Sequence, residues 1–329
     1  MTANTLHSSK WLHRYAKLLT GVTFLLIIAG GLVTSTHSGL SVPDWPLSYG
    51  QWMPPMVGGI FYEHSHRMIA ASVGVMTLVL TLWVGFTEQK KWLRWMVIGA
   101  LGTVVLQGIL GGLTVLFLLP APISIIHACL AQTFFTLVVS IAYLTNPALG
   151  EDFTLQEKRE SSQSIFEPLK KLLFMTAGLT YAQLILGAAL RHTENRLIII
   201  PHVLSAFLIL IHVIFILVYV FRNLAPRPSN FDEYAALCRL KWTTRHFNLN
   251  EALEQNRTFF LGSIILGVIS VFQIALGMGS FVFTRMLSEA VQPTILKVLF
   301  VTAHQTLGAL LLGTTVFLLL HARQIGRVS

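Results

Sequence analysis

The sequence predicts an all-α integral membrane protein whose eight transmembrane helices form two pseudo-symmetric four-helix bundles. Hydrophobic residues make up 54% of the 329 residues and charged residues only 11%, whereas a soluble domain carries about 25% charged residues. The mean hydropathy is +0.67, and the apolar residues fall in runs long enough to cross a hydrocarbon core about 30 Å thick. A short motif and a histidine recur at equivalent places in successive runs, which predicts two related halves.

The apolar runs predict helices rather than strands. Backbone groups inside lipid must be hydrogen-bonded within the protein, which restricts spanning segments to helices or a closed barrel. The runs are continuous and do not alternate with the period of two that a barrel strand shows, so helices are expected. They leave a long first loop at 36–62, a linker at 146–170 and a polar segment at 222–257. The expected spans are residues 17–35, 63–86, 96–117, 123–145, 171–190, 197–221, 258–284 and 298–320.

The basic residues predict how the chain crosses the bilayer. With a cytoplasmic N-terminus, 18 of the 23 Lys and Arg residues fall in cytoplasmic segments and five in outer ones. Cytoplasmic loops are enriched in basic residues, so both termini are expected in the cytoplasm. The same bias accounts for a pI of about 9.8 without any nucleic-acid partner.

Three of the expected spans share a Gln-x-x-Leu-Gly motif. It occurs at Gln107–Gly111, Gln183–Gly187 and Gln273–Gly277, and the first span has a version without the glutamine, Ala29-Gly30-Gly31. The glycines alone could serve close helix packing, but a glutamine at the same offset three times favours duplication. We therefore expect an N-terminal half of residues 1–150 and a C-terminal half of residues 151–329.

Each even-numbered span carries one histidine soon after it enters from the outer side, followed four residues later by a small residue. Residues four apart lie on one helix face, one turn apart, so the surface beside each of these histidines is bare enough for a flat ligand. His64 and His212 differ, because Met68 and Ile216 occupy that position. The four pairs are His66 and Ala70, His127 and Ala131, His202 and Ala206, and His304 and Gly308.

Histidines inside a membrane span are expensive and usually functional. Zinc would need tetrahedral sites completed by cysteine or carboxylate, and no such residues accompany these four. Haem iron accepts paired axial ligands, imidazole among them. The sequence therefore predicts two haem sites, His66 with His127 and His202 with His304. The alternative is that the four histidines form hydrogen bonds between helices.

The two halves differ at the start of the second span. Glu63, His66 and Arg67 fall within about 100° of arc on a helix, whereas His64 projects to the other side and is expected either at the rim or as a support for the residues that bind the ligand. Glu63 could stabilise positive charge on a substrate, take up protons, or pair with Arg67. Because the C-terminal half has no acidic residue at this position, we expect the substrate in the first half and a permanent redox cofactor in the second.

The sequence resembles the haem A synthase family over nearly its whole length. The resemblance rests on Glu63-x-x-His66-Arg67, on the run from Gly39 to Pro46, on the duplicated four-helix plan and on the single histidines of the later even-numbered spans. It implies oxidation of one methyl group of haem O to a formyl group by successive hydroxylations, which gives haem A for terminal oxidases. It also implies catalytic roles for Glu63 and Arg67, substrate haem at His66 and His127, and resident haem b at His202 and His304.

The resemblance further implies a setting and partners. The setting is a bacterial cytoplasmic (inner) membrane, and the partners are haem O, the haem O synthase that supplies it and an electron acceptor. Exposed glycine and tryptophan surfaces in the lipid bilayer are compatible with a homo-oligomer. Many members carry a cysteine pair in the first outer loop, where this sequence has Ser41 and Ser48 instead, so it resembles a cysteine-free branch.

Two other classes of function compete with this interpretation. A transmembrane di-haem b-type electron-transfer cytochrome would bind haem without modifying it, but it needs haems at different depths, whereas the four histidines lie near one side. A transporter would fit the internal repeat. Transporters usually contain broken helices and charges at the membrane midplane, and this sequence indicates neither.

Overall fold

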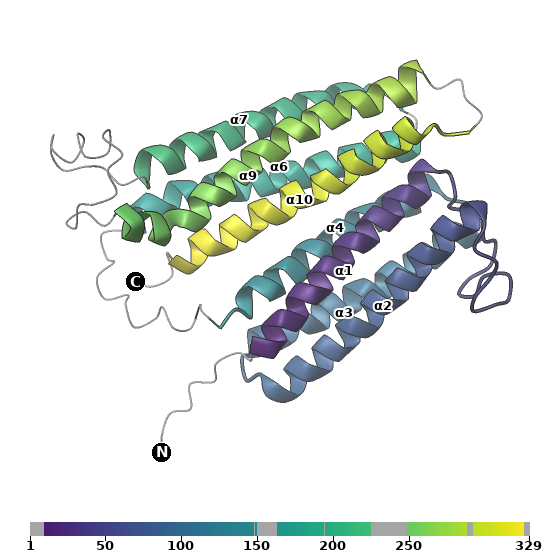
Figure 1. Ribbon diagram of the computed structural model, residues 1–329, viewed down its shortest axis with the longest axis horizontal. Coiled ribbons are helices and arrows are strands. Elements are labelled where there is room, and N and C mark those ends of the chain that lie inside the picture. The colour runs from purple at the N-terminus through teal and green to yellow at the C-terminus, as the bar shows by residue number, and fades with distance from the viewer. Residues whose placement is uncertain are drawn as a thin grey trace.

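The computed structural model describes residues 10–147, 149, 163–193, 195–224, 249–287 and 292–325. Eight helices in this part of the chain are long and apolar enough to cross a membrane, which confirms the predicted number (Figure 1). They are α1 (Lys10–Ser35), α2 (Gly58–Thr87), α3 (Lys91–Leu116), α4 (Ala121–Leu144), α6 (Gln163–Thr193), α7 (Ile199–Asn223), α9 (Leu249–Phe281) and α10 (Ile295–Ile325). A short η3 (Arg196–Ile198) precedes α7, and η4 (Val282–Met286) follows α9.

Several helices begin earlier than the apolar runs predicted. α2 begins at Gly58, so the first loop comprises residues 36–57 rather than 36–62. α6 begins at Gln163 and α9 at Leu249. The helices therefore include the last residues of the expected linker at 146–170 and of the expected polar segment at 222–257. The reason is that helical hydrogen bonds continue into polar turns, whereas an apolar run marks only the part of a helix that lipid surrounds.

The helices pack in the same cyclic order in each half. α1 contacts α2 and α4, and α3 contacts the same two helices; in the second half α6 contacts α7 and α10, and α9 contacts the same two. α1 and α4 contact α10, and α4 also contacts α6, so these four helices form the interface between the halves. The arrangement is consistent with the predicted pair of four-helix bundles, and the expected boundary near residue 150 lies between α4 and α6.

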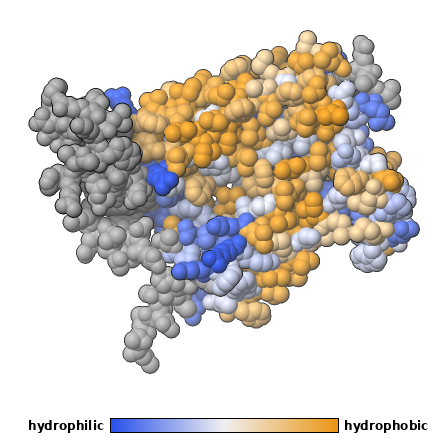
Figure 2. All heavy atoms as spheres, in the orientation of Figure 1, coloured by the Kyte–Doolittle hydropathy of each residue, from blue (hydrophilic) through white to orange (hydrophobic). Residues whose placement is uncertain are grey.

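Many hydroxyl groups of the helices bond to a carbonyl of the same helix, and apolar side chains face outward. Thr23 donates to the carbonyl of Leu19 at 2.8 Å and Thr77 to that of Val73 at 2.7 Å, which suits a place where no water is available. Figure 2 shows that one face of the molecule is largely apolar along the helices. This surface suits a hydrocarbon solvent.

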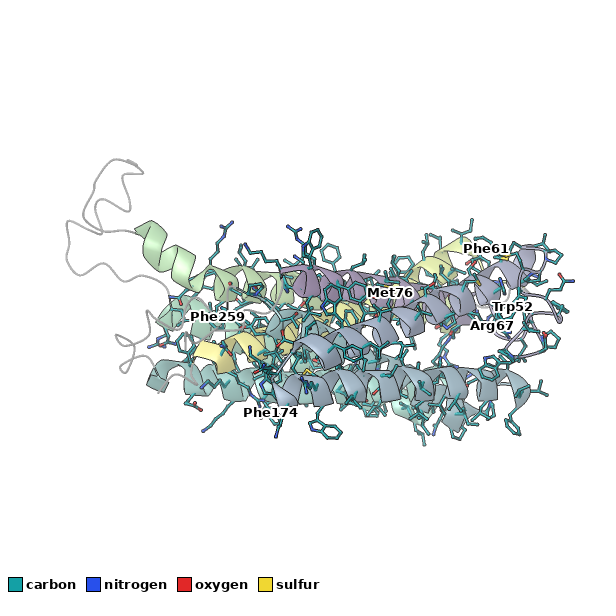
Figure 3. All side chains as sticks on the ribbon, turned by 90° about the horizontal axis from the view of Figure 1, so that it is seen from below. Trp52, Phe61, Arg67, Met76, Phe174 and Phe259 are labelled. Atoms are coloured by element: carbon teal, nitrogen blue, oxygen red, sulfur yellow. The ribbon has the colours of Figure 1, made fainter. Side chains whose placement is uncertain are left out.

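The first loop marks one end of the molecule. It joins α1 to α2 and lies at the right of Figure 1, whereas α1 begins and α10 ends at the other end. We call the end that carries the first loop the loop end. Figure 3 shows Trp52 and Arg67 there, and Phe174 and Phe259 towards the opposite end.

Candidate functional site

The four predicted ligand histidines all lie within the first three turns of helices that start at the loop end. Each imidazole rests on a glycine of the preceding helix, where a side chain would collide with it. A Cβ added at the glycine would lie 2.9–3.4 Å from the Cε1 atom of the histidine. The pairs are Gly30 with His66 at 3.2 Å, Gly111 with His127 at 3.4 Å, Gly187 with His202 at 3.2 Å and Gly277 with His304 at 2.9 Å.

The glutamine of the repeated motif forms a hydrogen bond with the histidine that rests on the glycine of the same motif. Gln107 donates from its side-chain amide to the carbonyl of His127 at 2.9 Å, and Gln183 donates to that of His202 at 2.8 Å. In the last repeat it is the backbone carbonyl of Gln273 that lies 3.1 Å from Nδ1 of the histidine ring. The motif therefore builds a seat for a histidine of the next helix, a role that the sequence analysis missed.

The structure brings His202 and His304 together. They come from α7 and α10, which lie diagonally opposite in the second half, and their ring centroids are 6.3 Å apart with the planes at 74°. A metal lies about 2 Å from each ligating nitrogen, so two imidazoles that bind one metal must keep their rings apart by more than van der Waals contact. The observed spacing fits a haem iron between the two rings.

His66 and His127 form the corresponding pair in the first half. They come from α2 and α4, which are also diagonally opposite. The rings of His66, His127 and His202 each have a backbone hydrogen-bond acceptor four residues before their glycine, at Leu26, Gln107 and Gln183, as Nδ1 of His304 has at Gln273. A ligating imidazole commonly has its other ring nitrogen held by such a partner, so these rings are suited to bind a metal.

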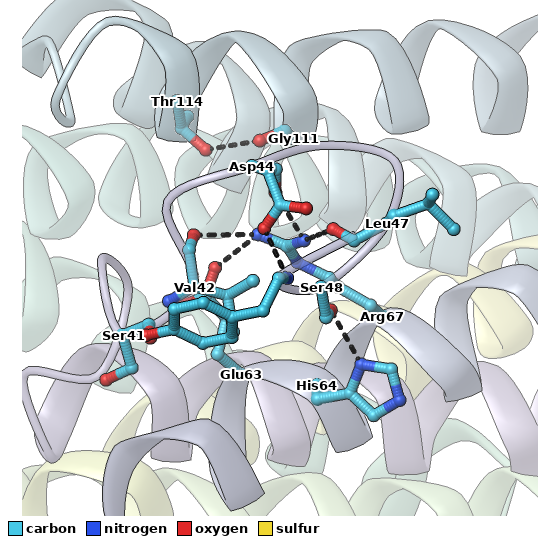
Figure 4. A network of polar contacts seen from close by, with 11 residues as sticks. Ser41, Val42, Asp44, Leu47, Ser48, Glu63, His64, Arg67, Gly111 and Thr114 are labelled. Carbon is cyan, nitrogen blue, oxygen red and sulfur yellow. Dashed lines mark hydrogen bonds and ion pairs between the residues drawn. The ribbon is translucent and has the colours of Figure 1, made fainter. Parts of the chain in front are cut away.

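Glu63 lies one helical turn towards the loop end from His66, and it is buried. Its side chain makes a 2.6 Å ion pair with Arg67, and its other carboxylate oxygen accepts a 2.8 Å hydrogen bond from the backbone N–H of Val42 in the first loop (Figure 4). Only 3% of Glu63 is exposed. The ion pair that the sequence left as one of three roles is therefore present, and it encloses the carboxylate next to a predicted iron ligand.

Arg67 holds the first loop against α2. Its guanidinium donates to the carbonyl oxygens of Asp44 at 2.7 Å, Leu47 at 2.8 Å and Val42 at 3.2 Å (Figure 4). A rigid fork of donors suits several acceptors at once. A single side chain thus fixes both Glu63 and the path of the loop.

The carboxylate of Asp44 shapes the turn that follows. It accepts backbone N–H groups of Tyr49 at 2.7 Å and Gly50 at 2.8 Å. The hydrogen bond from Gly50, and after it that from Tyr49 and the charge of Arg67, hold the pKa of Asp44 below its ordinary value despite the opposing effect of desolvation. The turn is therefore stabilised by an ionised Asp44.

Two further contacts fasten the first loop to the helices below. Nδ1 of His64 lies 2.8 Å from the hydroxyl of Ser48, and His64 is buried rather than at an open rim. The ring of Trp45 lies on Gly112 of α3, where an added Cβ would be 2.7 Å from Cδ2. Both contacts fix the first loop on the first half.

Fold and site together define a polytopic membrane protein in which each four-helix half seats two histidines on glycines and a tied loop covers one half. The chain belongs to the COX15-CtaA family, described as cytochrome oxidase assembly protein, whose sequence profile matches residues 13–60 and 57–208. The matched region includes His66, His127 and His202. His304 lies outside it, and the structure pairs it with His202.

Curated relatives carry the name heme A synthase. The protein from Bacillus pumilus (strain SAFR-032) is 30% identical over 189 residues, which cover 55% of this chain and 58% of that protein. The protein from Symbiobacterium thermophilum is 31% identical over 177 residues, which cover 53% and 56%. That from Geobacillus kaustophilus (strain HTA426) is 27% identical over 199 residues, which cover 58% of each chain. The chain thus spans a little over half the length of these relatives.

Proposed function

We propose that this protein is a haem A synthase that oxidises one methyl group of haem O to a formyl group by successive hydroxylations. Its family membership and the names of its relatives support the reaction class. The observation that carries the proposal is the difference between the two histidine pairs. Both halves seat two histidines, but within the described ranges only the first places a buried carboxylate and a tied loop beside them, a difference that suits one reacting and one permanent site.

The substrate haem binds in the first half, with His66 and His127 as its iron ligands. Haem iron supplies the redox chemistry when it is bound. Glu63 places negative charge near the ligand, where it stabilises positive charge that develops on the substrate as electrons leave it. Arg67 orients Glu63 and holds the first loop over the site, which excludes water from the reacting group.

The second half binds a resident haem b between His202 and His304. The 6.3 Å spacing of these rings leaves room for an iron between them. A haem held by these two residues would supply a redox centre between the substrate site and an external acceptor. The 1–150 and 151–329 halves are therefore a substrate half and a cofactor half.

The protein lies in a bacterial cytoplasmic membrane with both termini in the cytoplasm. The excess of basic residues on one side supports this orientation, and α1 begins at the same end of the bundle at which α10 ends (Figure 1). The substrate site then faces the outer leaflet. A haem O synthase in the same membrane supplies the substrate, and a homo-oligomer is compatible with the exposed apolar faces.

The second candidate function is a di-haem b-type electron-transfer cytochrome, which the two histidine pairs would equally support. It is less favoured because all four histidines lie near the loop end. Electron transfer across a bilayer needs haems at different depths. His212, the histidine deeper in α7, has its Nδ1 2.9 Å from the carbonyl of Leu208 and so has a helix-internal partner.

Extraction and mass analysis of the haems in the purified protein test the proposal. With haem O supplied, the protein should contain haem b together with haem O, haem A or a hydroxylated intermediate. His66→Ala should lose the substrate haems and keep haem b, His304→Ala should lose haem b, and the control His212→Ala should lose neither. Two haem b per chain with and without haem O would favour the cytochrome and reject the synthase.

A further inference from the structure

Positive charges gather at the loop end of the second half. Arg191 lies near the end of α6, Arg285 in η4 and Lys297 in the first turn of α10. Arg191 interacts electrostatically with both Arg285 and Lys297. His37 of the first loop completes the group: burial lowers the pKa of its imidazole, and the charges of Arg191 and Lys297 lower it further.

No carboxylate within the described ranges neutralises these charges. The ion pairs there are Glu63–Arg67 and Glu167–Lys170, and Arg191 donates a hydrogen bond to the carbonyl of Thr34 at 2.8 Å. Like charges held together at the edge of a low-dielectric region repel one another. An arrangement of this kind is expected where an anionic ligand supplies the missing charge.

The cations stand in register with the histidine pair of the second half. Arg191 follows Gly187, the seat of His202, by four residues, and Lys297 precedes His304 by seven. These spacings place each cation within about 40° of the same helix face, and about 6 Å and 10 Å along the axis towards the loop end. A flat ligand held between the two imidazoles would therefore have its edge at the cations.

We propose that Arg191, Lys297 and Arg285 bind the two propionate carboxylates of the haem that His202 and His304 hold. The inference rests on the proposed haem site and identifies how that site orients its ligand. Guanidinium groups bind carboxylates through paired hydrogen bonds. The cations thus fix which edge of the macrocycle faces the loop end, while the imidazoles fix only its plane. Phosphate headgroups of anionic lipid offer the same chemistry of anionic oxygens, and the experiment distinguishes the two sources.

The full chain, carrying His66→Ala so that the second pair alone binds, is made by cell-free synthesis into zwitterionic nanodiscs without haem. It is titrated with iron protoporphyrin IX or with its dimethyl ester, which lacks the carboxylates. The diacid should bind about tenfold or more tightly than the diester, because charge-assisted hydrogen bonds are strong in such an environment. Arg191→Gln and Lys297→Gln should each lose most of this preference.

The control is Arg196→Gln, because Arg196 is an exposed arginine in η3 at the same end. It should keep the full preference. Unchanged diester affinity in Arg191→Gln would show that the variant is folded. In the haem-loaded protein Arg191→Gln should also lower the midpoint potential of the second-half haem, since less positive charge near the iron favours its oxidised form.

Three results would overturn the inference. The first is equal affinity for diacid and diester in the parent chain, and the second is a preference that survives both glutamine variants. The third is a combination of two observations: Arg191→Gln keeps the preference for the diacid, and phosphatidylglycerol stabilises the parent chain but not Arg191→Gln. That combination would assign the cations to lipid. In all three haem still binds, so the proposed function stands. Binding of neither form would reject the proposed haem site itself.

Discussion

The imidazole of His304 lies directly against Gly277, where an added Cβ would be 2.9 Å from Cε1. Gly277→Ala should therefore push the ring out of its position between α9 and α10. Overpacking in a tight site costs about 1–3 kcal/mol, so the affinity of the second-half site for haem should fall about tenfold or more. Haem content and absorbance titration of the purified variant measure this.

The matched control for the glycine seat is Gly178→Ala. Gly178 also lies in a helix of the second half, but its added Cβ would have no neighbour within 4 Å. Alanine has the higher helix propensity, so this variant should bind haem as the parent does. If both variants retained haem equally, the glycine would not be a seat for the histidine.

Glu63→Gln tests the charge of the buried carboxylate separately from its position. Glutamine keeps the size of the side chain and can still accept the hydrogen bond from Val42, so both haems should be retained. If the negative charge stabilises the substrate during oxidation, conversion of haem O should fall by about tenfold or more. Mass analysis of haem products over time gives the rate.

Arg67→Ala tests the structural role of the Glu63–Arg67 ion pair. It would remove three hydrogen bonds to the first loop and leave Glu63 buried without its partner, a change that costs about 3–5 kcal/mol in buried pairs. The variant should have a lower melting temperature in detergent and a first loop more rapidly cleaved by protease than in Glu63→Gln. Normal turnover in Glu63→Gln would assign the carboxylate to this structural role alone.

Asp44 gives the first loop a predicted pH dependence. Its pKa in the folded protein is held below the ordinary 3.8 by the backbone N–H of Gly50 and then that of Tyr49. A group with a lowered folded pKa stabilises the fold above its unfolded pKa, and the stabilisation is lost as the pH falls through the folded value. Protease cleavage of the first loop should therefore increase below about pH 4.

Asp44→Asn should remove most of this dependence. Asparagine keeps one oxygen acceptor, but it cannot be protonated in this range, so the loop should be cleaved at a similar rate across the acidic window. An unchanged acid dependence in this variant would show that another group controls the loop. The acid-stable endopeptidase pepsin suits the measurement.

The number of spans and the positions of the four histidines could be predicted because both follow from strong local rules. Lipid requires long apolar helices, and a histidine stands out on such a helix. The diagonal pairing of His202 with His304 also agrees with the pairing expected from the duplication. The ends of α6 and α9 were less predictable, because a helix does not need lipid to continue.

The contacts between elements could not be predicted from local pattern. Gly30 seats His66 although Leu26 replaces the glutamine of the other repeats, so the essential position of the motif is the glycine. Conversely, the burial of His64 depends on Ser48 in a loop without regular structure. Such tertiary contacts leave no periodic signal in the sequence.

The ring of Trp45 in the first loop lies against Gly112 of α3. Gly112→Ala would place a Cβ 2.7 Å from Cδ2 of Trp45, and the rigid indole can give way only if the loop moves. Because the loop covers the first half alone, conversion of haem O should fall while haem b stays bound in the second half. Gly108→Ala, one turn away on α3 and with no neighbour within 4 Å of the added Cβ, should convert haem O normally. Loss of both haems in Gly112→Ala would instead mean that the loop supports the whole bundle, whereas an unaffected variant would mean that the position of Trp45 does not matter for the substrate site.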